Sequence, residues 1–439
     1  MYDLAVIGLG PAGLEAIKVA LKNDLKVVAF EDKELGGTCL NVGCVPTKAI
    51  LHTAEILHCL KNSSKIGIDF FAKPTCNWAN ILDRKMDIVS KFTKTLNSSL
   101  PKKITLVKAK AELVLTDDEI QIVADDNIYE AKNIILATGS SPIELPNLKF
   151  DHKFIVSSDD VFRLEKLPKR VAVVGSGAIG LEWAKIFSEF DVETTLIEKA
   201  QSLAPAMDID IQKRVERILK LSNIKFYKND FISEINDKKL KLNSGVEFEV
   251  DMVLLAVGRK PNLPEIPVSG CCENYKIKVY EDYSTDFENL YVVGDANREI
   301  MLAHAASNQA KQVVEKIVSN KEIEKKPVPA VIYTTPEIAS IGLKEHDIKE
   351  DEKSSYKISK ILLSSIAKPW CDNAYDGFVK VIVKDNLILG AHIVSKEASA
   401  LISIFSVIIS AKITVDEVRD MIFPHPSFAE TILEVLENV

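Results

Sequence analysis

The stretch Asp3-Leu-Ala-Val-Ile-Gly-Leu-Gly-Pro-Ala-Gly13 decides the fold of this 439-residue chain. Its glycines are Gly8, Gly10 and Gly13. An apolar strand precedes them, a helix-like segment follows at Leu14–Lys22, and a second apolar strand at Leu25–Phe30 ends in Glu31. This order is typical of a dinucleotide-binding unit, because the glycines let the backbone approach a pyrophosphate at a helix N-terminus. Glu31 is then placed to accept a hydrogen bond from a ribose hydroxyl.

The same pattern occurs a second time. Arg170–Val174 predicts the strand, Leu181–Phe190 the helix, and Thr194–Ile197 a strand that is followed by Glu198. The glycines of this copy are Gly175, Gly177 and Gly180. The first glycine and the acid lie 23 residues apart in both copies. The chain is therefore predicted to carry two dinucleotide-binding domains.

The two copies also end in similar segments, each an apolar strand followed by a glycine. The first ends in Asn133–Gly139, which includes Thr138, and the second ends in Met252–Gly258. From first glycine to closing glycine, the first copy is 48 residues longer than the second. We expect an insertion there, with amphipathic helices near Thr47–Lys61 and Trp78–Leu96.

The longer copy holds two cysteines, Cys39 and Cys44, in the stretch Gly36–Lys48. On a regular helix, residues five apart are separated by about 7.5 Å of rise, beyond the roughly 7 Å between Cα atoms that a disulfide tolerates. A bridge therefore requires a broken turn, which Gly43 and Pro46 permit. A redox-active disulfide and two unpaired thiols at a helix start are both compatible with this spacing.

The composition excludes several classes of protein. The net charge is −8, and without a long basic run, nucleic-acid binding is not expected. No apolar run reaches the roughly 18 residues of a spanning helix, so no membrane contact is expected. The first strand begins near Tyr2, which leaves no room for a signal peptide. Seven cysteines are too few for a secreted disulfide scaffold, so we expect a cytoplasmic protein, in which a disulfide is more often catalytic.

The rest of the chain adds an acid and a third domain. Leu290–Val293 predicts a short strand that leads to Asp295, although a Gly-Asp pair is usually part of a surface turn. Residues 330–439 mix helices with strands at Phe378–Val383 and Ile388–Val394, which indicates an α+β domain. The adjacent Cys271 and Cys272 fall in a connector, where a role as a metal or redox pair is not favoured.

His425 lies between two prolines near the C-terminus, so it cannot be inside a helix. Glu430, five residues later, can hold one ring nitrogen and leave the other as a base. A lone histidine is more often structural, and on sequence alone both interpretations stay open.

Together these motifs resemble the flavin-dependent pyridine nucleotide-disulfide oxidoreductases, in order and over nearly the whole chain. The motifs are Gly36–Lys48, the two glycine fingerprints, Ala137–Gly139, Gly258–Asn262, Tyr291–Asp295, and His425-Pro426 with Glu430. The resemblance implies an α/β fold with two Rossmann-like dinucleotide-binding domains and an α+β C-terminal dimerisation domain. The implied boundaries are 1–148 for the FAD-binding domain with the cysteine pair, 149–268 for the NAD-binding domain, 269–326 for a segment that returns to the FAD-binding domain, and 327–439 for the interface domain.

The resemblance also implies roles for single residues. Cys39 would exchange with substrate sulfur, and Cys44 would lie against the flavin. Lys48 would pair with Glu182 beside the flavin nitrogen that receives hydride. His425, oriented by Glu430 and supplied by the partner subunit of a homodimer, would be the acid and base for the thiols.

Other implied residues contact the two cofactors, FAD and NAD. Glu31 would bind the adenosine end of FAD and Asp295 its ribityl chain. The remaining implied contacts are Thr38, Lys48, Thr138, Gly139, Gly258, Met301, Leu302, Ala303 and His304. No metal ligand is implied.

Within the family, the motifs most resemble the enzymes that oxidise dihydrolipoamide on the lipoyl domains of 2-oxo acid dehydrogenase or glycine cleavage complexes. NAD is favoured over NADP because Glu198 occupies the position at which a protein that binds the 2′-phosphate of NADP would carry arginine. Two alternatives stay open: another NAD(P)H-dependent disulfide reductase, similar to glutathione reductase, and a non-catalytic flavin-binding NADH sensor. The sensor is less favoured because Cys39, Cys44 and His425 are all present.

Overall fold

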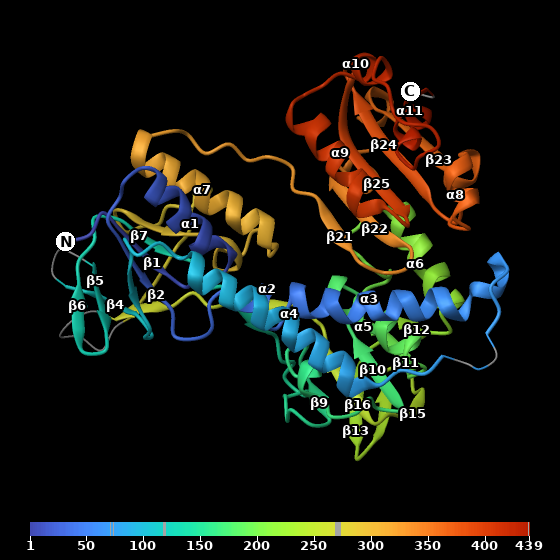
Figure 1. The fold of residues 1–439 in the computed structure, drawn as a ribbon, viewed down its shortest axis with the longest axis horizontal. Helices are drawn as coiled ribbons and strands as arrows, with labels where there is room; N and C mark the ends of the chain where they lie inside the picture. Colours follow the sequence, from blue (N-terminus) through green and yellow to red (C-terminus); the bar gives the residue numbers. More distant parts are fainter. Residues whose placement is uncertain (71, 73, 117–119, 268–273, 438) are drawn as a thin grey trace. The chain divides into compact units, whose positions relative to one another are not determined.

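The computed structural model describes residues 1–70, 72, 74–116, 120–267, 274–437 and 439 (Figure 1). Cys271 and Cys272 lie outside these residues. The chain forms two compact units. The first unit comprises Met1–Ile50, Asn80–Ile143 and Arg259–Lys325, and the second comprises Leu51–Ala79, Glu144–Gly258 and Lys326–Val439. The finer domain boundaries expected from the sequence stay predictions.

The first unit is built on a five-stranded parallel sheet in the order β20-β7-β1-β2-β3. Its strands are β1 (Leu4–Ile7), β2 (Val27–Phe30), β3 (Thr105–Val107), β7 (Ile134–Leu136) and β20 (Leu290–Val292). β1, β2 and β7 are buried along their whole length, as expected for apolar strands covered on both faces. Because all the strands run parallel, the turns after β1, β2, β7 and β20 meet at one edge of the sheet.

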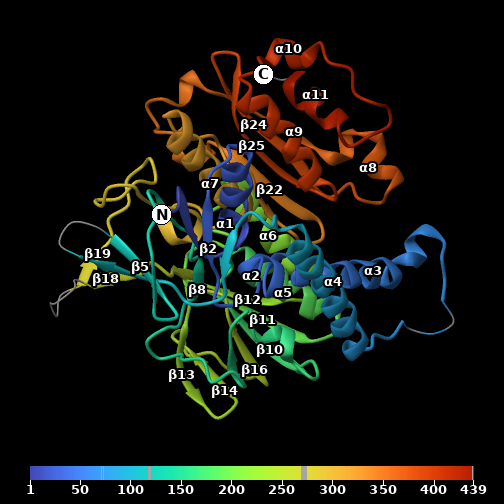
Figure 2. The same ribbon diagram turned by 60° about the vertical axis from the view of Figure 1, so that its left-hand side comes forward.

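Helices α1 (Pro11–Lys22) and α7 (Ala303–Ser319) lie side by side in this unit (Figures 1 and 2). The hydroxyl of Ser307, in the first turns of α7, donates to the carbonyl of Pro11, 3.2 Å away. The remaining elements of this unit are α2 (Gly37–Asn41), the three-stranded sheet β4 (Glu112–Leu115), β5 (Ile120–Ala124) and β6 (Asn127–Tyr129), and the pairs β8 (Ser140–Pro142) with β17 (Arg259–Pro261) and β18 (Glu265–Pro267) with β19 (Asn274–Lys276). Helices α3 (Cys44–Lys61) and α4 (Trp78–Ser99) each have residues in both units.

The second unit repeats this architecture. Its parallel sheet has the order β12-β11-β10-β16-β9, and β10 takes the place of β1. Its strands are β9 (Ile155–Val156), β10 (Arg170–Val174), β11 (Glu193–Glu198), β12 (Lys225–Lys228) and β16 (Met252–Leu255). Helix α5 (Ala178–Glu189) follows β10, α6 (Ile209–Leu221) leads to β12, and a three-stranded sheet is formed by β13 (Ile232–Asn236), β14 (Lys239–Leu242) and β15 (Glu247–Glu249).

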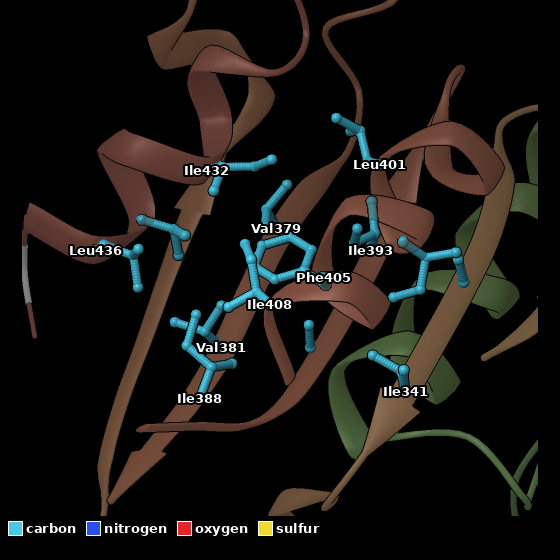
Figure 3. Packing of buried hydrophobic residues seen from close by; sticks show 14 of the residues in the cluster. Ile341, Val379, Val381, Ile388, Ile393, Leu401, Phe405, Ile408, Ile432 and Leu436 are labelled. Carbon is cyan, nitrogen blue, oxygen red and sulfur yellow. The ribbon is translucent and has the colours of Figure 1, made fainter. Parts of the chain in front are cut away.

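The C-terminal part of the second unit is an antiparallel sheet in the order β21-β22-β25-β24-β23. Its elements are β21 (Ala330–Ile332), β22 (Glu337–Gly342), β23 (Lys357–Leu362), α8 (Ala367–Cys371), β24 (Phe378–Lys384), β25 (Leu387–Ser395), α9 (Ala398–Ser410), α10 (Val415–Arg419) and α11 (Glu430–Glu437). Phe405 of α9 and Ile432 of α11 belong to the apolar core that the helices form with the sheet, together with Val379 of β24 (Figure 3).

A buried ion cluster connects this sheet to α6. The Lys380 ammonium is fully buried and lies 2.8 Å from Asp208 Oδ1 and 3.0 Å from Asp210 Oδ2. A third carboxylate, that of Glu345, lies 2.5 Å from the same ammonium. A buried ammonium is tolerated only when it is paired and hydrogen-bonded, so this contact fixes α6 against the sheet.

The α/β fold class predicted from the sequence is confirmed. The helices of both copies begin three residues earlier than expected, at Pro11 and Ala178 instead of Leu14 and Leu181. The reason is that the last glycine of each fingerprint lies inside the first helical turn and does not precede it. Among the residues that the structure describes, no helix combines the length and the apolar character needed to cross a membrane.

Candidate functional site

The first glycine fingerprint forms a tight backbone cradle at the end of β1. Gly8 has a φ of +93°, and a Cβ placed there would lie 2.5 Å from the carbonyl oxygen of Ala137. A Cβ on Gly13 would lie 1.9 Å from the carbonyl oxygen of Gly8. Both positions therefore require glycine, and this tight turn leads directly into α1, whose N-terminus is the kind of place where proteins bind anions.

Glu31 lies at the end of β2, beside this cradle. Its Oε2 accepts a hydrogen bond from the backbone N–H of Leu9 at 2.7 Å, and its Oε1 accepts from Lys33 N–H at 3.0 Å. The structure thus places Glu31 in contact with the glycine turn, as predicted.

The ends of β7 and β20 meet at the same edge. The hydroxyl of Ser140 donates to Asp295 Oδ2 at 2.5 Å and accepts from Arg259 Nε at 2.8 Å. The Asp295 carboxylate is therefore held by Ser140, and Ser140 is held in turn by Arg259 from another segment of the first unit. The Thr138 hydroxyl oxygen is buried there and has no hydrogen-bond partner among the described residues, as expected of a group that meets a ligand.

Sequence reasoning missed Ser140 and Arg259. Their only signal was position: Ser140 directly follows Gly139, and Arg259 lies in the Gly258–Asn262 motif, where it was assigned no role. Their pairing spans 119 residues, and nothing local predicts it.

The cysteine stretch is attached to the first cradle. The N–H of Gly36 donates to the carbonyl of Leu9 at 2.9 Å. A Cβ on Gly37 would lie 2.9 Å from the Cα of Gly10, so the two backbones are in close contact. Sequence reasoning placed the cysteines beside the first nucleotide site, and these contacts bring them there.

The turn between the two cysteines is broken. Cys39 lies in the short helix α2, and Cys44 begins α3. Between them, a Cβ on Gly43 would lie 2.8 Å from the Thr38 carbonyl oxygen, so only glycine allows so close a contact. The expected interruption of the helix is confirmed.

Both residues are thiols in this structure, with Cys44 exposed and Cys39 half-buried. A hydrogen bond between the two thiols, together with burial, raises the pKa of Cys39, although the positive charge of Lys48 acts in the opposite direction. The hydrogen bond from Cys44 and the burial thus favour the protonated form of Cys39.

The second fingerprint repeats the first. Gly175 has a φ of +100°, and a Cβ there would lie 2.4 Å from the Ala256 carbonyl oxygen. A Cβ on Gly180 would lie 1.9 Å from the Gly175 carbonyl oxygen, the same distance as in the first copy. Glu198 accepts from the N–H groups of Ser176 and Ala200, each at 2.7 Å.

Glu182 is buried in α5, and its Oε1 accepts from the N–H of Tyr333 at 3.0 Å. Lys48 belongs to the first unit and Glu182 to the second, so their pairing stays a prediction.

His425 and Glu430 form a pair in the second unit. His425 Nδ1 lies 2.7 Å from Glu430 Oε1, and the histidine side chain is 73% exposed. The hydrogen bond from His425, with a second from the N–H of Ser427, holds the pKa of Glu430 below its usual range. The carboxylate is thus ionised at neutral pH and orients the ring. The His425–Pro426 peptide is cis.

The predicted residues fall into two groups. In the first unit lie Gly8, Gly10, Gly13, Glu31, Thr38, Cys39, Cys44, Lys48, Thr138, Gly139, Asp295 and Met301–His304, the last at the start of α7. In the second unit lie Gly175, Gly177, Gly180, Glu182, Glu198, Gly258, His425 and Glu430. Where the structure describes the chain, no group of three or more potential metal ligands occurs.

The residues present fit two dinucleotides. Each cradle joins a glycine turn that excludes side chains to a helix N-terminus and a carboxylate on the neighbouring strand. The buried Thr138 hydroxyl and the fixed Asp295 carboxylate add polar groups to the first.

Comparison with known proteins shows similarity over nearly the whole chain. The chain is 32% identical to dihydrolipoyl dehydrogenase of Mycoplasma pneumoniae, covering 100% of this chain and 98% of the relative. It is 30% identical to dihydrolipoyl dehydrogenase of Bacillus subtilis, covering 99% and 97%. The crystal structure of LpdA from Mycobacterium tuberculosis shares the fold, with a TM-score of 0.89 and 24% identity over 99% of both chains.

Two family models match. Residues 328–436 match the dimerisation domain of the pyridine nucleotide-disulphide oxidoreductases, which supports a homodimer. Residues 2–310 match the pyridine nucleotide-disulphide oxidoreductase model itself. With both models matched and relatives similar over the full length, the chain belongs to the pyridine nucleotide-disulphide oxidoreductase family.

Proposed function

We propose that this protein is a dihydrolipoamide dehydrogenase that oxidises protein-bound dihydrolipoamide to lipoamide and reduces NAD+ to NADH. The observation that carries the proposal is the hydrogen-bonded pair of Cys39 and Cys44 beside the first dinucleotide cradle. Relatives named dihydrolipoyl dehydrogenase, similar over the full length, support it.

The thiol chemistry is assigned to Cys39. In the oxidised enzyme, a thiolate of dihydrolipoamide attacks Cys39 Sγ, the Cys39–Cys44 bond breaks, and Cys44 leaves as a thiolate. The second substrate thiolate then attacks the substrate sulfur in this mixed disulfide and releases lipoamide and Cys39. The raised pKa of Cys39 suits this role, because the released sulfur takes up a proton readily.

Proton transfer is assigned to His425. Thiolates are the reactive species, so the substrate thiols need a base that titrates near neutral pH. The Glu430 carboxylate holds Nδ1, which leaves Nε2 to take the substrate proton and to return one to Cys39. In the proposed homodimer, His425 serves the cysteine pair of the partner subunit.

The cofactors of this family are FAD and NAD. We assign FAD to the first cradle, with Glu31 and Asp295, and NAD to the second, with Glu198. Bound FAD would supply two-electron transfer between the Cys44 thiolate and NAD+. The overall reaction is balanced: dihydrolipoamide loses two electrons and two protons, and NAD+ takes up a hydride while one proton is released.

Lys48 and Glu182 are proposed to form an ion pair that positions and tunes the reacting end of FAD. The proposed partners are the lipoyl domains of 2-oxo acid dehydrogenase or glycine cleavage complexes, and the proposed location is the cytoplasm.

A steady-state assay tests this function. Purified FAD-loaded protein is given dihydrolipoamide with NAD+ and, in parallel, glutathione disulfide with NADPH. The proposal predicts rapid NADH formation in the first assay and little turnover in the second. Turnover of glutathione disulfide alone would support a glutathione reductase instead, and absence of turnover in both would support a binding protein.

A further inference from the structure

The two glycine fingerprints differ at one buried position. The residue between the first two glycines is Leu9 in the first copy and Ser176 in the second, and both side chains are fully buried, at 0% exposure. A buried hydroxyl is unfavourable unless it is hydrogen-bonded, whereas a buried leucine is favourable by itself. The contacts of Ser176 therefore indicate what the hydroxyl does.

Ser176 is hydrogen-bonded both to Glu198, the acid expected to bind the ribose, and to the loop that follows Glu198. Its Oγ donates to Glu198 Oε2 at 2.6 Å and accepts from the N–H of Ala204 at 3.0 Å. The backbone N–H of Ser176 donates to the same Oε2 at 2.7 Å. Ala204 has a φ of +49°, in the left-handed region, so the hydroxyl binds the loop at a constrained position.

These bonds leave Glu198 little freedom. A carboxylate oxygen accepts about two hydrogen bonds. Oε2 is filled by the two donors of Ser176, and Oε1 accepts one, from Ala200 at 2.7 Å. Among the described residues, one acceptor position therefore remains, on Oε1. Within the described part of the chain, Glu31 of the first copy has one such donor on each oxygen, Leu9 N–H and Lys33 N–H.

We propose that Ser176 is a positioning residue that fixes Glu198 in the orientation that accepts a ribose hydroxyl and rejects a 2′-phosphate. The inference rests on the proposed binding of NAD by the second cradle and deepens it. Held on Oε2 by two donors, Glu198 cannot turn away from a phosphate, so the repulsion between the two anions is not relieved. A ribose hydroxyl, in contrast, meets an oriented acceptor.

The test measures binding and does not depend on turnover. Calorimetry gives the Kd of NAD+ and NADP+ for the oxidised, FAD-loaded dimer. Ser176→Ala should weaken NAD+ binding about tenfold, the size typical of one lost hydrogen bond to a charged group. NADP+ binding should stay unchanged or improve, so the preference for NAD+ falls by at least the same factor.

A matched control is Ser188→Ala on the same domain. Ser188 Oγ donates to the carbonyl of Ser222 at 2.6 Å at the far end of α5, so this variant also loses one hydroxyl contact. It should leave both Kd values unchanged. Thermal melting of each variant checks the fold.

A double-mutant cycle separates positioning from a structural role. In the Glu198→Ala background, Ser176→Ala should change the NAD+ affinity less than twofold, because no carboxylate remains to be oriented. Equal weakening of NAD+ and NADP+ by Ser176→Ala, with or without Glu198, would show that Ser176 only holds the loop and would overturn the inference. If Ser176→Ala folds poorly, Ser176→Thr takes its place in the test. It retains the hydroxyl and should therefore keep the preference for NAD+ over NADP+.

The outcomes for the two proposals are distinct. If NAD+ binds with the predicted dependence on Ser176 but dihydrolipoamide is not oxidised, the proposed function fails and the inference stands. If dihydrolipoamide is oxidised normally and Ser176→Ala binds both nucleotides like the wild type, only the inference fails.

Discussion

His425 Nδ1 lies 2.7 Å from Glu430 Oε1, and a second carboxylate oxygen of Glu430 accepts from the N–H of Ser427 at 2.8 Å. The acid is thus held by the backbone and in turn holds the ring. An exposed histidine fixed in this way is oriented without being buried, as a base that must reach a second molecule requires.

Replacing His425, the proposed base, should slow the reaction without unfolding the protein. His425→Gln should lower kcat for dihydrolipoamide oxidation about 10²- to 10⁴-fold, the range typical of general base catalysis. Glu430→Gln should lower it less, because the base remains but its orientation is weaker. Steady-state kinetics measures both.

The control for this prediction is His152→Asn. His152 Nδ1 also lies 3.0 Å from a carboxylate, that of Asp160, but it belongs to no proposed site. The kcat of His152→Asn should equal that of the wild type. An unaffected His425→Gln would remove His425 from the mechanism.

Two glycines of the second fingerprint should respond differently to alanine. A Cβ on Gly180 would overlap the Gly175 carbonyl at 1.9 Å, so Gly180→Ala should lower the melting temperature. No described atom lies within 4 Å of a Cβ on Gly177, so Gly177→Ala should fold normally. It should still bind NAD+ more weakly, because the added methyl group faces the approach of the pyrophosphate. Melting curves and NAD+ calorimetry test this; normal NAD+ affinity in Gly177→Ala would contradict the assignment of the cradle.

Loss of the carboxylate at the end of β20 should reduce the content of FAD. Asp295→Ala removes the acceptor that Ser140 holds at 2.5 Å and should yield folded protein with less bound flavin. Ser140→Ala should show a smaller loss, since Asp295 remains but is less fixed. The ratio of flavin to protein absorbance measures this. Asp286→Asn, on the surface, is the control, and full flavin content in Asp295→Ala would exclude the proposed contact.

The acid stability of the second unit should depend on Glu189. Burial raises the pKa of this carboxyl, but the hydrogen bond from His58 at 2.9 Å and the charge of Lys185 outweigh burial and lower it to about 2. A lowered pKa in the folded state contributes stability above the unfolded value near 4.5, and this contribution is lost as pH falls towards 2.

Glu189→Gln should therefore cost on the order of 3 kcal/mol at neutral pH. The melting temperature of the wild type should fall steeply between about pH 5 and 2, and that of Glu189→Gln should fall less over the same interval. The exposed Glu165→Gln should follow the wild type. Parallel curves for wild type and Glu189→Gln would show that this pair does not contribute.

Local spacing made much of the site predictable. The glycine turns, Glu31, Glu198 and the pair of His425 and Glu430 each depend on residues close in the sequence or on a repeated interval. Such features are fixed by backbone geometry within one or two turns, so the sequence contains the necessary information.

Long-range contacts were not predictable in this way. Arg259 and Ser140 are 119 residues apart, and Lys380 and Asp208 are 172 apart. The apolar neighbours of Lys380, such as Val379 and Val381, predict a strand but do not show which carboxylates its ammonium meets. The small sheets β4–β6 and β13–β15 were also missed, because strands of three to five residues are too short for a clear alternating pattern.

Electrons are proposed to pass from a dithiol through Cys39 and Cys44 to the flavin, and anaerobic absorption spectroscopy of the FAD-loaded protein tests this path most directly. Addition of one equivalent of dihydrolipoamide should produce a long-wavelength charge-transfer band from the Cys44 thiolate to the flavin. Oxidised Cys39→Ser should retain such a band, and Cys44→Ser should lack it. A band in Cys44→Ser and none in Cys39→Ser would show that the two thiols have the opposite roles, and absence of any band in the wild type would contradict the account.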